Sequence, residues 1–255
     1  MKGKRQMEAI KTVNLTKKYK DVTAVCGLDL TVEHGELFAL LGVNGAGKTT
    51  AIKMLSTLTL PTEGDAFIYG KSVLSDKNGV RSLIAVSPQE TAVAPNLTVK
   101  ENLELMAGAH GFTKDKTAEK VSSLIKRFSL SEIENKKAGK LSGGWQRRLS
   151  IAMALICEPK LLFLDEPTLG LDVIARSELW DIIKSLRGTT TVILTTHYME
   201  EAEALSDRIA IMKKGELVFV GTADEIKTKA ETDRFEDAFI KLVKGSENGN
   251  EVTRK

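Results

Sequence analysis

Residues 37–50 read Leu-Phe-Ala-Leu-Leu-Gly-Val-Asn-Gly-Ala-Gly-Lys-Thr-Thr, and this stretch decides the fold. Its first part, Leu37 to Leu41, is an apolar run typical of a buried parallel strand. Its second part, Gly42 to Thr49, matches the pattern G-x-x-x-x-G-K-[ST] and opens a helical pattern. A phosphate-binding loop needs this place between a strand and a helix, so the sequence predicts a P-loop.

The residue types of this loop suit a nucleoside triphosphate. Glycines let backbone N–H groups approach phosphate oxygens, and the helix N-terminus adds a favourable dipole. Lys48 is expected to reach the β- and γ-phosphates, and the Thr49 hydroxyl to bind Mg²⁺. The predicted nucleotide-binding residues of the loop are Gly42, Asn44, Gly45, Ala46, Gly47, Lys48, Thr49 and Thr50.

A second apolar run, Leu161 to Leu164, ends in two carboxylates, Asp165 and Glu166. Acids at a strand end are common as helix caps, so the pair alone would indicate little. Beside a P-loop, Asp165 is predicted to hold Mg²⁺ through a water, and Glu166 to accept a proton from the attacking water. The reaction predicted from these residues is nucleotide hydrolysis.

A third stretch, Leu141-Ser142-Gly143-Gly144-Trp145-Gln146, stands before a long helical pattern. Ser142, Gly143 and Gly144 would therefore open a helix with free N–H groups, which favour a second anion. The P-loop already cradles one nucleotide, so this helix start is most simply explained if it serves a nucleotide held by another copy. On these residues alone, an ordinary capped helix start stays open.

Short apolar runs separated by helical patterns predict the rest of the core. The runs Ile84 to Val86, Val192 to Leu194 and Ile209 to Met212 indicate strands of a largely parallel α/β sheet. Before them, residues 10–32 alternate as solvent-facing antiparallel strands do. Residues 95–158 show helical spacing and no obvious strand, which predicts an inserted helical lobe.

These patterns predict a domain at 1–230, with its core at 1–94 and 159–230 and the helical lobe at 95–158. Helices are expected at 223–229 and 234–243. The segment from Gly245 to Lys255 is polar enough to predict a frayed tail, so 231–255 are expected to form a C-terminal helix and tail.

Composition excludes several classes of protein. With 42% hydrophobic and 28% charged residues, the chain is typical of a globular protein, and no apolar stretch is long enough to span a membrane. Cys26 and Cys157 are expected to be reduced, partly buried thiols, which fits the cytoplasm. The N-terminus shows no secretory signal, and a net charge of +3 is too weak to indicate nucleic acid as a partner.

The P-loop, the Leu-Ser-Gly-Gly stretch and Leu-Asp-Glu-Pro, in this order, resemble the ATP-binding cassette (ABC) ATPases over roughly residues 8–230. The resemblance implies a RecA-like P-loop NTPase core that binds and hydrolyses Mg·ATP. It implies that Gln89 senses Mg²⁺ and the membrane partner, and that His197 contacts the γ-phosphate. It also implies that Tyr19 stacks on adenine and that Asp172 links the two sites of a dimer.

The partners implied by the resemblance are integral-membrane permease subunits and a second copy of the chain or a homologous cassette, at the cytoplasmic face of the membrane. Many members have Gln after the signature glycines; Trp145 stands there instead, which puts a ribose contact in doubt and suggests packing within the lobe. Residues 57–64 and 196–203 resemble the subfamily that exports drugs, antibiotics or polysaccharides.

Other nucleotide-binding classes fit less well. The run Asn135-Lys136-Lys137-Ala138 lacks the aspartate of a guanine-reading Asn-Lys-x-Asp motif, which argues against a signalling GTPase. A small-molecule kinase has no use for a helix start aimed at a second nucleotide. A soluble ABC ATPase acting in translation or DNA repair stays open as the alternative.

Overall fold

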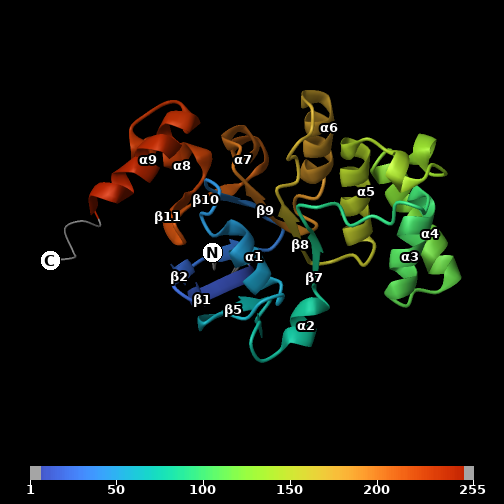
Figure 1. The fold of residues 1–255 in the computed structure, drawn as a ribbon, viewed down its shortest axis with the longest axis horizontal. Coiled ribbons are helices and arrows are strands. Elements are labelled where there is room, and N and C mark those ends of the chain that lie inside the picture. Colours follow the sequence, from blue (N-terminus) through green and yellow to red (C-terminus); the bar gives the residue numbers. More distant parts are fainter. Residues whose placement is uncertain (1–6, 250–255) are drawn as a thin grey trace, which may run out of the picture.

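The computed structural model describes residues 7–249 and contains two sheets with helices around them (Figure 1). The larger sheet has the order β11-β10-β4-β9-β8-β7. Its five strands from β10 to β7 are parallel, and β11 pairs with β10 antiparallel, so the predicted mostly parallel sheet is confirmed. The bounds are β4 Leu37–Leu41, β7 Ile84–Ser87, β8 Leu161–Asp165, β9 Thr191–Thr196, β10 Arg208–Lys213 and β11 Glu216–Gly221.

The strand order brings three functional segments to one edge of this sheet. Every residue of β4 and β8 is buried, as their continuous apolar runs predict. The P-loop follows β4, Asp165 ends β8 and His197 follows β9, which lies between these two strands. Ligands of α/β sheets bind outside the carboxyl ends of the strands, so this edge is where a nucleotide site belongs.

The smaller sheet is antiparallel and is built from β1 Glu8–Tyr19, β2 Val22–Leu28, β3 Thr31–Glu33, β5 Glu63–Ile68 and β6 Lys71–Ser72. The flap predicted over residues 10–32 is confirmed, but β5 and β6 enlarge it and were not predicted. Helix α1 (Lys48–Leu55) lies between the two sheets, where Ile52 and Leu55 share a core with Phe38 of β4 and Ile68 of β5.

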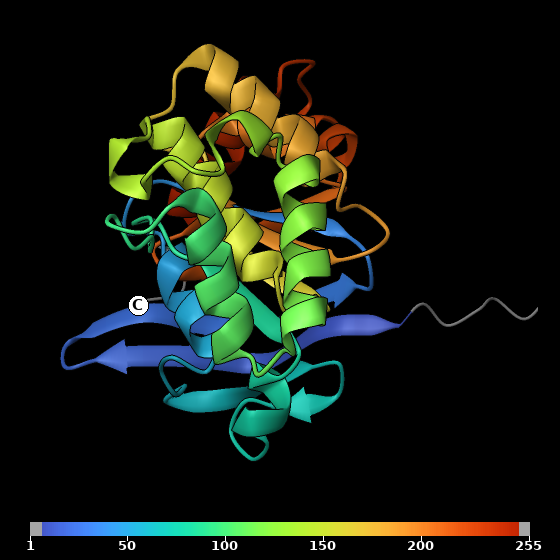
Figure 2. The same cartoon turned by 90° about the vertical axis from the view of Figure 1, so that its right-hand side faces the viewer.

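Residues 95–158 form helices and no strand in the described chain, namely α3 Val99–Ala109, α4 Lys114–Arg127 and α5 Gly143–Leu155, with short 3-10 turns between α4 and α5 (Figure 2). Thr98 and Glu101 form a capping box that begins α3. Leu103 and Phe128 of this group belong to the same core cluster as Leu162 of β8. The domain boundaries at 94, 158 and 230 stay predictions.

The remaining helices are α2 Lys77–Arg81, α6 Val173–Lys184, α7 Met199–Leu205, α8 Ala223–Ala230 and α9 Phe235–Gly249. The prediction of a tail is wrong for residues 245–249, because α9 continues to Gly249. No proline interrupts this segment, and extending an existing helix costs little free energy. The rest of that predicted tail lies outside the described residues. Within 7–249, no helix combines the length and apolar character needed to cross a membrane.

Candidate active site

A cavity of about 630 Å³ opens at the carboxyl ends of β4, β8 and β9. It brings together most of the predicted site residues, including the P-loop and the side chains expected to act on the nucleotide. It is lined by Val22, Thr23, Ala24, residues 44–50, Gln89, Glu166, Leu169, His197 and Lys214. Gly42 and Asp165 are not among the lining residues, but Lys48 and Thr49 contact them.

Two kinds of constraint explain the glycines of the P-loop. A Cβ at Gly42 or Gly47 would collide with the carbonyl oxygen of Met212 or Ala24. Gly45 has a left-handed backbone with φ of +80°, yet a Cβ there would meet nothing within 4 Å. The space beside Gly45 is therefore free of protein atoms, and a phosphate group could occupy it.

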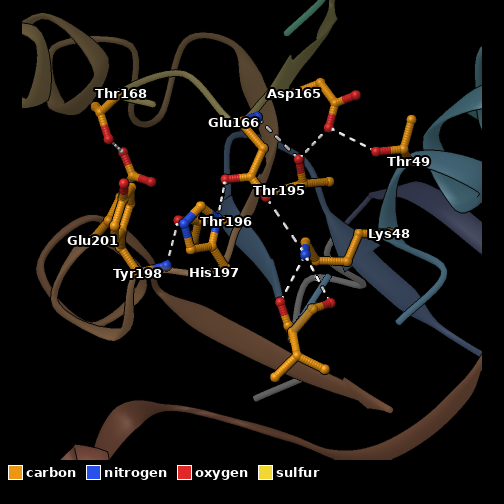
Figure 3. Close-up of polar contacts among 12 residues, drawn as sticks. Lys48, Thr49, Asp165, Glu166, Thr168, Thr195, Thr196, His197, Tyr198 and Glu201 are labelled. Atoms are coloured by element: carbon orange, nitrogen blue, oxygen red, sulfur yellow. Dashed lines mark hydrogen bonds and ion pairs between the residues drawn. The ribbon is translucent and has the colours of Figure 1, made fainter. Parts of the chain in front are cut away.

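Lys48 is buried and held at the mouth of this cradle. Its Nζ donates hydrogen bonds to the carbonyl oxygens of Gly42 (2.7 Å) and Val43 (3.3 Å). The same Nζ lies 3.5 Å from Oε1 of Glu166, and the two side chains are only 6% and 9% exposed. Figure 3 shows Lys48 between the P-loop carbonyls and Glu166. The buried cation therefore has a carboxylate as its counter-charge.

Thr49 and Asp165 meet beside Lys48 and present oxygen ligands. The Thr49 hydroxyl donates to Oδ1 of Asp165 at 3.2 Å, and the Thr195 hydroxyl donates to the same oxygen. Hydroxyl and carboxylate oxygens suit Mg²⁺, which usually takes its other ligands from water and substrate phosphates. In the described part of the chain, no group of three or more His, Cys, Asp or Glu side chains could hold a metal by itself.

Glu166 has a constrained backbone directly after β8. Its φ of 48° lies in the left-handed region, which a glutamate rarely adopts. Its N–H donates to the carbonyl and hydroxyl oxygens of Thr195 (3.1 and 3.0 Å), and Nδ1 of His197 donates to its carboxylate at 2.8 Å. A strained backbone of this kind persists only where surrounding contacts hold it. Here the contacts with Thr195 and His197 direct the Glu166 carboxylate toward the cavity (Figure 3).

Arg147 of α5 belongs to this constellation, although the sequence analysis missed it. It is 4% exposed and donates to the carbonyl oxygens of Pro88, Gln89 (2.8 Å) and Glu166 (2.9 Å). One guanidinium thus ties the loop that carries Gln89 to the loop that carries Glu166. The only sequence signal was an arginine within a helical run whose neighbours at residues 149–156 are mostly apolar.

The predicted second anion-binding segment, Ser142 to Gly144, does not lie at this cavity. Ser142 is the N-cap of α5 with an extended backbone, and its side chain makes no capping hydrogen bond. Neither Ser142 nor Gly143 or Gly144 lines the cavity, so the prediction that they serve a nucleotide on another copy stays a prediction. Trp145 packs against the core cluster with the Arg148 guanidinium 4.6 Å from its ring centre, as predicted for packing in the lobe.

Two residues named from the family resemblance also lie outside the cavity lining. Tyr19 ends β1, is 45% exposed and pairs with Val22, which does line the cavity. Asp172 accepts a hydrogen bond from the N–H of Ala175 and caps α6. Their roles in stacking on adenine and in linking two sites therefore stay predictions.

Comparison with known proteins identifies the family. The ABC transporter family model matches residues 25–169. The chain is 43% identical over 221 residues to the daunorubicin/doxorubicin resistance ATP-binding protein DrrA of Streptomyces peucetius, covering 86% of this chain and 67% of that protein.

Solved structures agree with this match. A dimeric ATP-binding cassette in a post-hydrolysis state with ADP and phosphate has a TM-score of 0.75 at 28% identity, covering 84% of this chain and 98% of that one. The cbiO1 protein of Clostridium perfringens, part of a transporter complex, has a TM-score of 0.81 at 27% identity, covering 89% and 93%. The chain belongs to the ABC transporter family and is an ATP-binding and ATP-hydrolysing subunit.

Proposed function

We propose that this subunit powers export of drug-like compounds through separate membrane subunits, bound at the cytoplasmic face of the membrane. The drug-resistance name of the Streptomyces relative supports export, and favours it over a role in translation or DNA repair. A transporter also needs membrane spans, and no helix within 7–249 is long and apolar enough to be one. Separate subunits would then supply the path and the selectivity.

In the proposed site, the N–H groups of residues 44–50 and the Lys48 ammonium bind the phosphates of ATP. Thr49, Asp165 and Gln89 would hold Mg²⁺, which would neutralise charge on the β- and γ-phosphates. The fit is supported by the open space at Gly45 and by the Thr49–Asp165 oxygen pair. Gln89 lines the cavity, and its carbonyl is fixed by Arg147.

The single observation that carries the proposed hydrolysis is the contact between Glu166 and His197 at the wall of the cavity. Glu166 would accept the proton of the attacking water, because its carboxylate is buried against the cavity and its backbone is locked. His197 donates Nδ1–H to that carboxylate, which orients the imidazole and leaves Nε2 for the γ-phosphate.

Each site is proposed to be completed by a second copy, through the N–H groups of Ser142, Gly143 and Gly144. The post-hydrolysis relative is a dimer, which supports this arrangement. It also explains why these residues lie away from the cavity of their own chain. In a two-fold dimer such contacts occur twice, so both cavities would be closed together.

The variants Glu166→Gln and His197→Ala test the catalytic assignment. Glu166→Gln should bind Mg·ATP at least as well as the wild type, because no carboxylate then competes with the phosphates for Lys48. It should hydrolyse ATP slower by about a hundredfold or more, because the amide cannot accept the proton of the attacking water. His197→Ala should bind ATP and lose turnover in the same way. Turnover near the wild-type rate in either variant would refute that residue's role.

The shared site is tested by crosslinking Ser142→Cys to Val43→Cys between chains, because Val43 is exposed beside the P-loop and leaves the phosphate cradle at Gly45 free. Cys157 is partly buried as predicted, but the prediction is wrong for Cys26, whose side chain lies on the exposed face of β2. Both are therefore first replaced by serine. Mixing the two single-cysteine chains should give an ATP-dependent crosslinked dimer in the Glu166→Gln background, whereas Val43→Cys mixed with Leu105→Cys, an exposed position on α3, should not. Equal crosslinking in both mixtures, or none with ATP, would refute the shared site.

A further inference from the structure

The His197 ring is supported from behind by a stack of side chains. The Tyr198 ring lies with its centroid 4.1 Å from that of His197, at an interplanar angle of 39°. The Arg176 guanidinium of α6 lies 4.9 Å from the centroid of the same Tyr198 ring. Through the hydrogen bond from His197 to Glu166, this stack runs from α6 to the proposed catalytic carboxylate.

Arg176 has little else to fix its position. Its Nε is buried and finds no hydrogen-bond partner among the described residues. A guanidinium over a tyrosine face is attracted by the ring quadrupole, and the attraction grows when water is excluded. The placement of this side chain is therefore best explained by its contact with Tyr198.

A second contact joins the same two segments one turn further along. Glu201 of α7 is fully buried, and its Oε1 accepts hydrogen bonds from Trp180 Nε1 (3.3 Å) and from the Thr168 hydroxyl (2.8 Å). Trp180 lies four residues after Arg176, so both project from the same face of α6. Thr168 belongs to the loop that follows Glu166, and Figure 3 shows its hydroxyl directed at Glu201.

We propose that Tyr198 and Glu201 are positioning residues, which hold His197 in register with Glu166 by attaching the segment after β9 to α6. This inference rests on the proposed role of His197. The contacts of these two residues connect α6, the loop after Glu166 and the His197 ring. Neither Tyr198 nor Glu201 lines the nucleotide cavity, so neither is a catalytic residue.

The geometry explains why His197 needs this support. Its side chain is 29% exposed, and the Nδ1–Glu166 hydrogen bond is its one polar contact among the described residues. A single hydrogen bond leaves the ring free to tilt about that contact, whereas a stacked ring restricts it. A misplacement of about 1 Å in a reacting group can cost roughly a hundredfold in rate. Tyr198 contacts Arg176 and Glu201 contacts Trp180, and both of these partners belong to α6, which begins after its N-cap Asp172. The orientation of the His197 ring therefore depends on the position of α6.

The test is steady-state ATPase activity and ATP affinity of the full chain with five variants. Tyr198→Ala should lower kcat by roughly tenfold to a hundredfold while the Kd for ATP changes by less than about twofold, because orientation and not binding is lost. Tyr198→Phe keeps the ring and should restore most of kcat. Arg176→Met should lower kcat on the order of fivefold. Glu201→Gln keeps an acceptor oxygen and should stay within about threefold of the wild type, whereas Glu201→Ala should resemble Tyr198→Ala.

Lys120→Met is the matched control. Lys120 lies 4.8 Å from the centre of the Phe112 ring in the helical group, so this change removes a cation from an aromatic face far from the site. It should leave kcat unchanged. If it lowers kcat as much as Arg176→Met, the effect is general destabilisation and the inference is wrong.

A double-mutant cycle separates the inference from the proposed function. If Tyr198 acts through His197, adding Tyr198→Ala to His197→Ala should lower the residual kcat by less than about twofold. Multiplicative effects would overturn the positioning role. Full activity of His197→Ala would overturn the proposed role of His197, whereas an inactive His197→Ala beside a fully active Tyr198→Ala would overturn only the inference.

Discussion

Replacing Arg147 by methionine should destabilise the chain and slow hydrolysis together. The guanidinium is 4% exposed and donates to three backbone carbonyls, those of Pro88, Gln89 and Glu166. Hydrogen bonds from a charged donor are worth about 1.5–3 kcal/mol each, but the three share one group and the loops relax, so we expect a loss of about 3–5 kcal/mol rather than their sum. For a chain of this size that corresponds to a Tm lower by about 6–20 °C.

The assay is urea unfolding followed by circular dichroism, with calorimetric Tm and kcat measured on the same samples. Arg127→Met is the control, because Arg127 is exposed and donates to the Ser185 carbonyl at 3.1 Å. The control should lose less than about 0.5 kcal/mol. If Arg147→Met unfolds on expression, Arg147→Lys keeps the charge and should show an intermediate loss. A stability of Arg147→Met equal to that of the control would refute the reasoning.

Two further predictions follow from the buried charges. Lys48→Ala should weaken ATP binding by roughly a hundredfold in calorimetry, because the phosphates lose a buried, charge-assisted hydrogen-bond donor. The control Lys53→Ala, on the exposed side of α1, should not change the affinity for ATP. An unchanged affinity of Lys48→Ala would contradict the proposed phosphate site. Burial raises the pKa of Glu201 above its ordinary value, so the native state holds its proton to higher pH than the unfolded state, and the stability contributed by this group is lost as pH rises through the folded pKa. Glu201→Gln should therefore gain stability relative to the wild type as pH rises from 5 to 8 in urea titrations, and a difference that does not change with pH would contradict this.

The sequence predicted those parts of the site that lie within a few residues of a strand end. The P-loop follows β4 directly and Asp165 ends β8, so a local pattern and the rule that parallel strands share one carboxyl edge were sufficient. His197 was placed by the resemblance to a family, and the structure brings its ring to Glu166. Site residues whose positions depend on short-range spacing along the chain can therefore be predicted from the sequence.

Contacts made by distant backbone atoms were not predictable in this way. Arg147 acts on carbonyl oxygens, which every residue possesses, so its partners leave no mark in the sequence. Strands β5 and β11 were also missed. Strand β5 begins with Glu63-Gly64-Asp65 and has no continuous apolar run. Strand β11 carries a short apolar run from Leu217 to Val220, which is only partly buried and was not interpreted as a strand. Pairing with β1 and β10 completes both strands.

The ion pair between Lys48 and Glu166 has a consequence for the proposed reaction. The ammonium that is proposed to bind the nucleotide lies 3.5 Å from the carboxylate that is proposed to activate water. In the proposed reaction, a triphosphate would therefore compete with the Glu166 carboxylate for Lys48. Binding of the phosphates would release Glu166 to accept a proton, so binding of the substrate and activation of the base would be coupled.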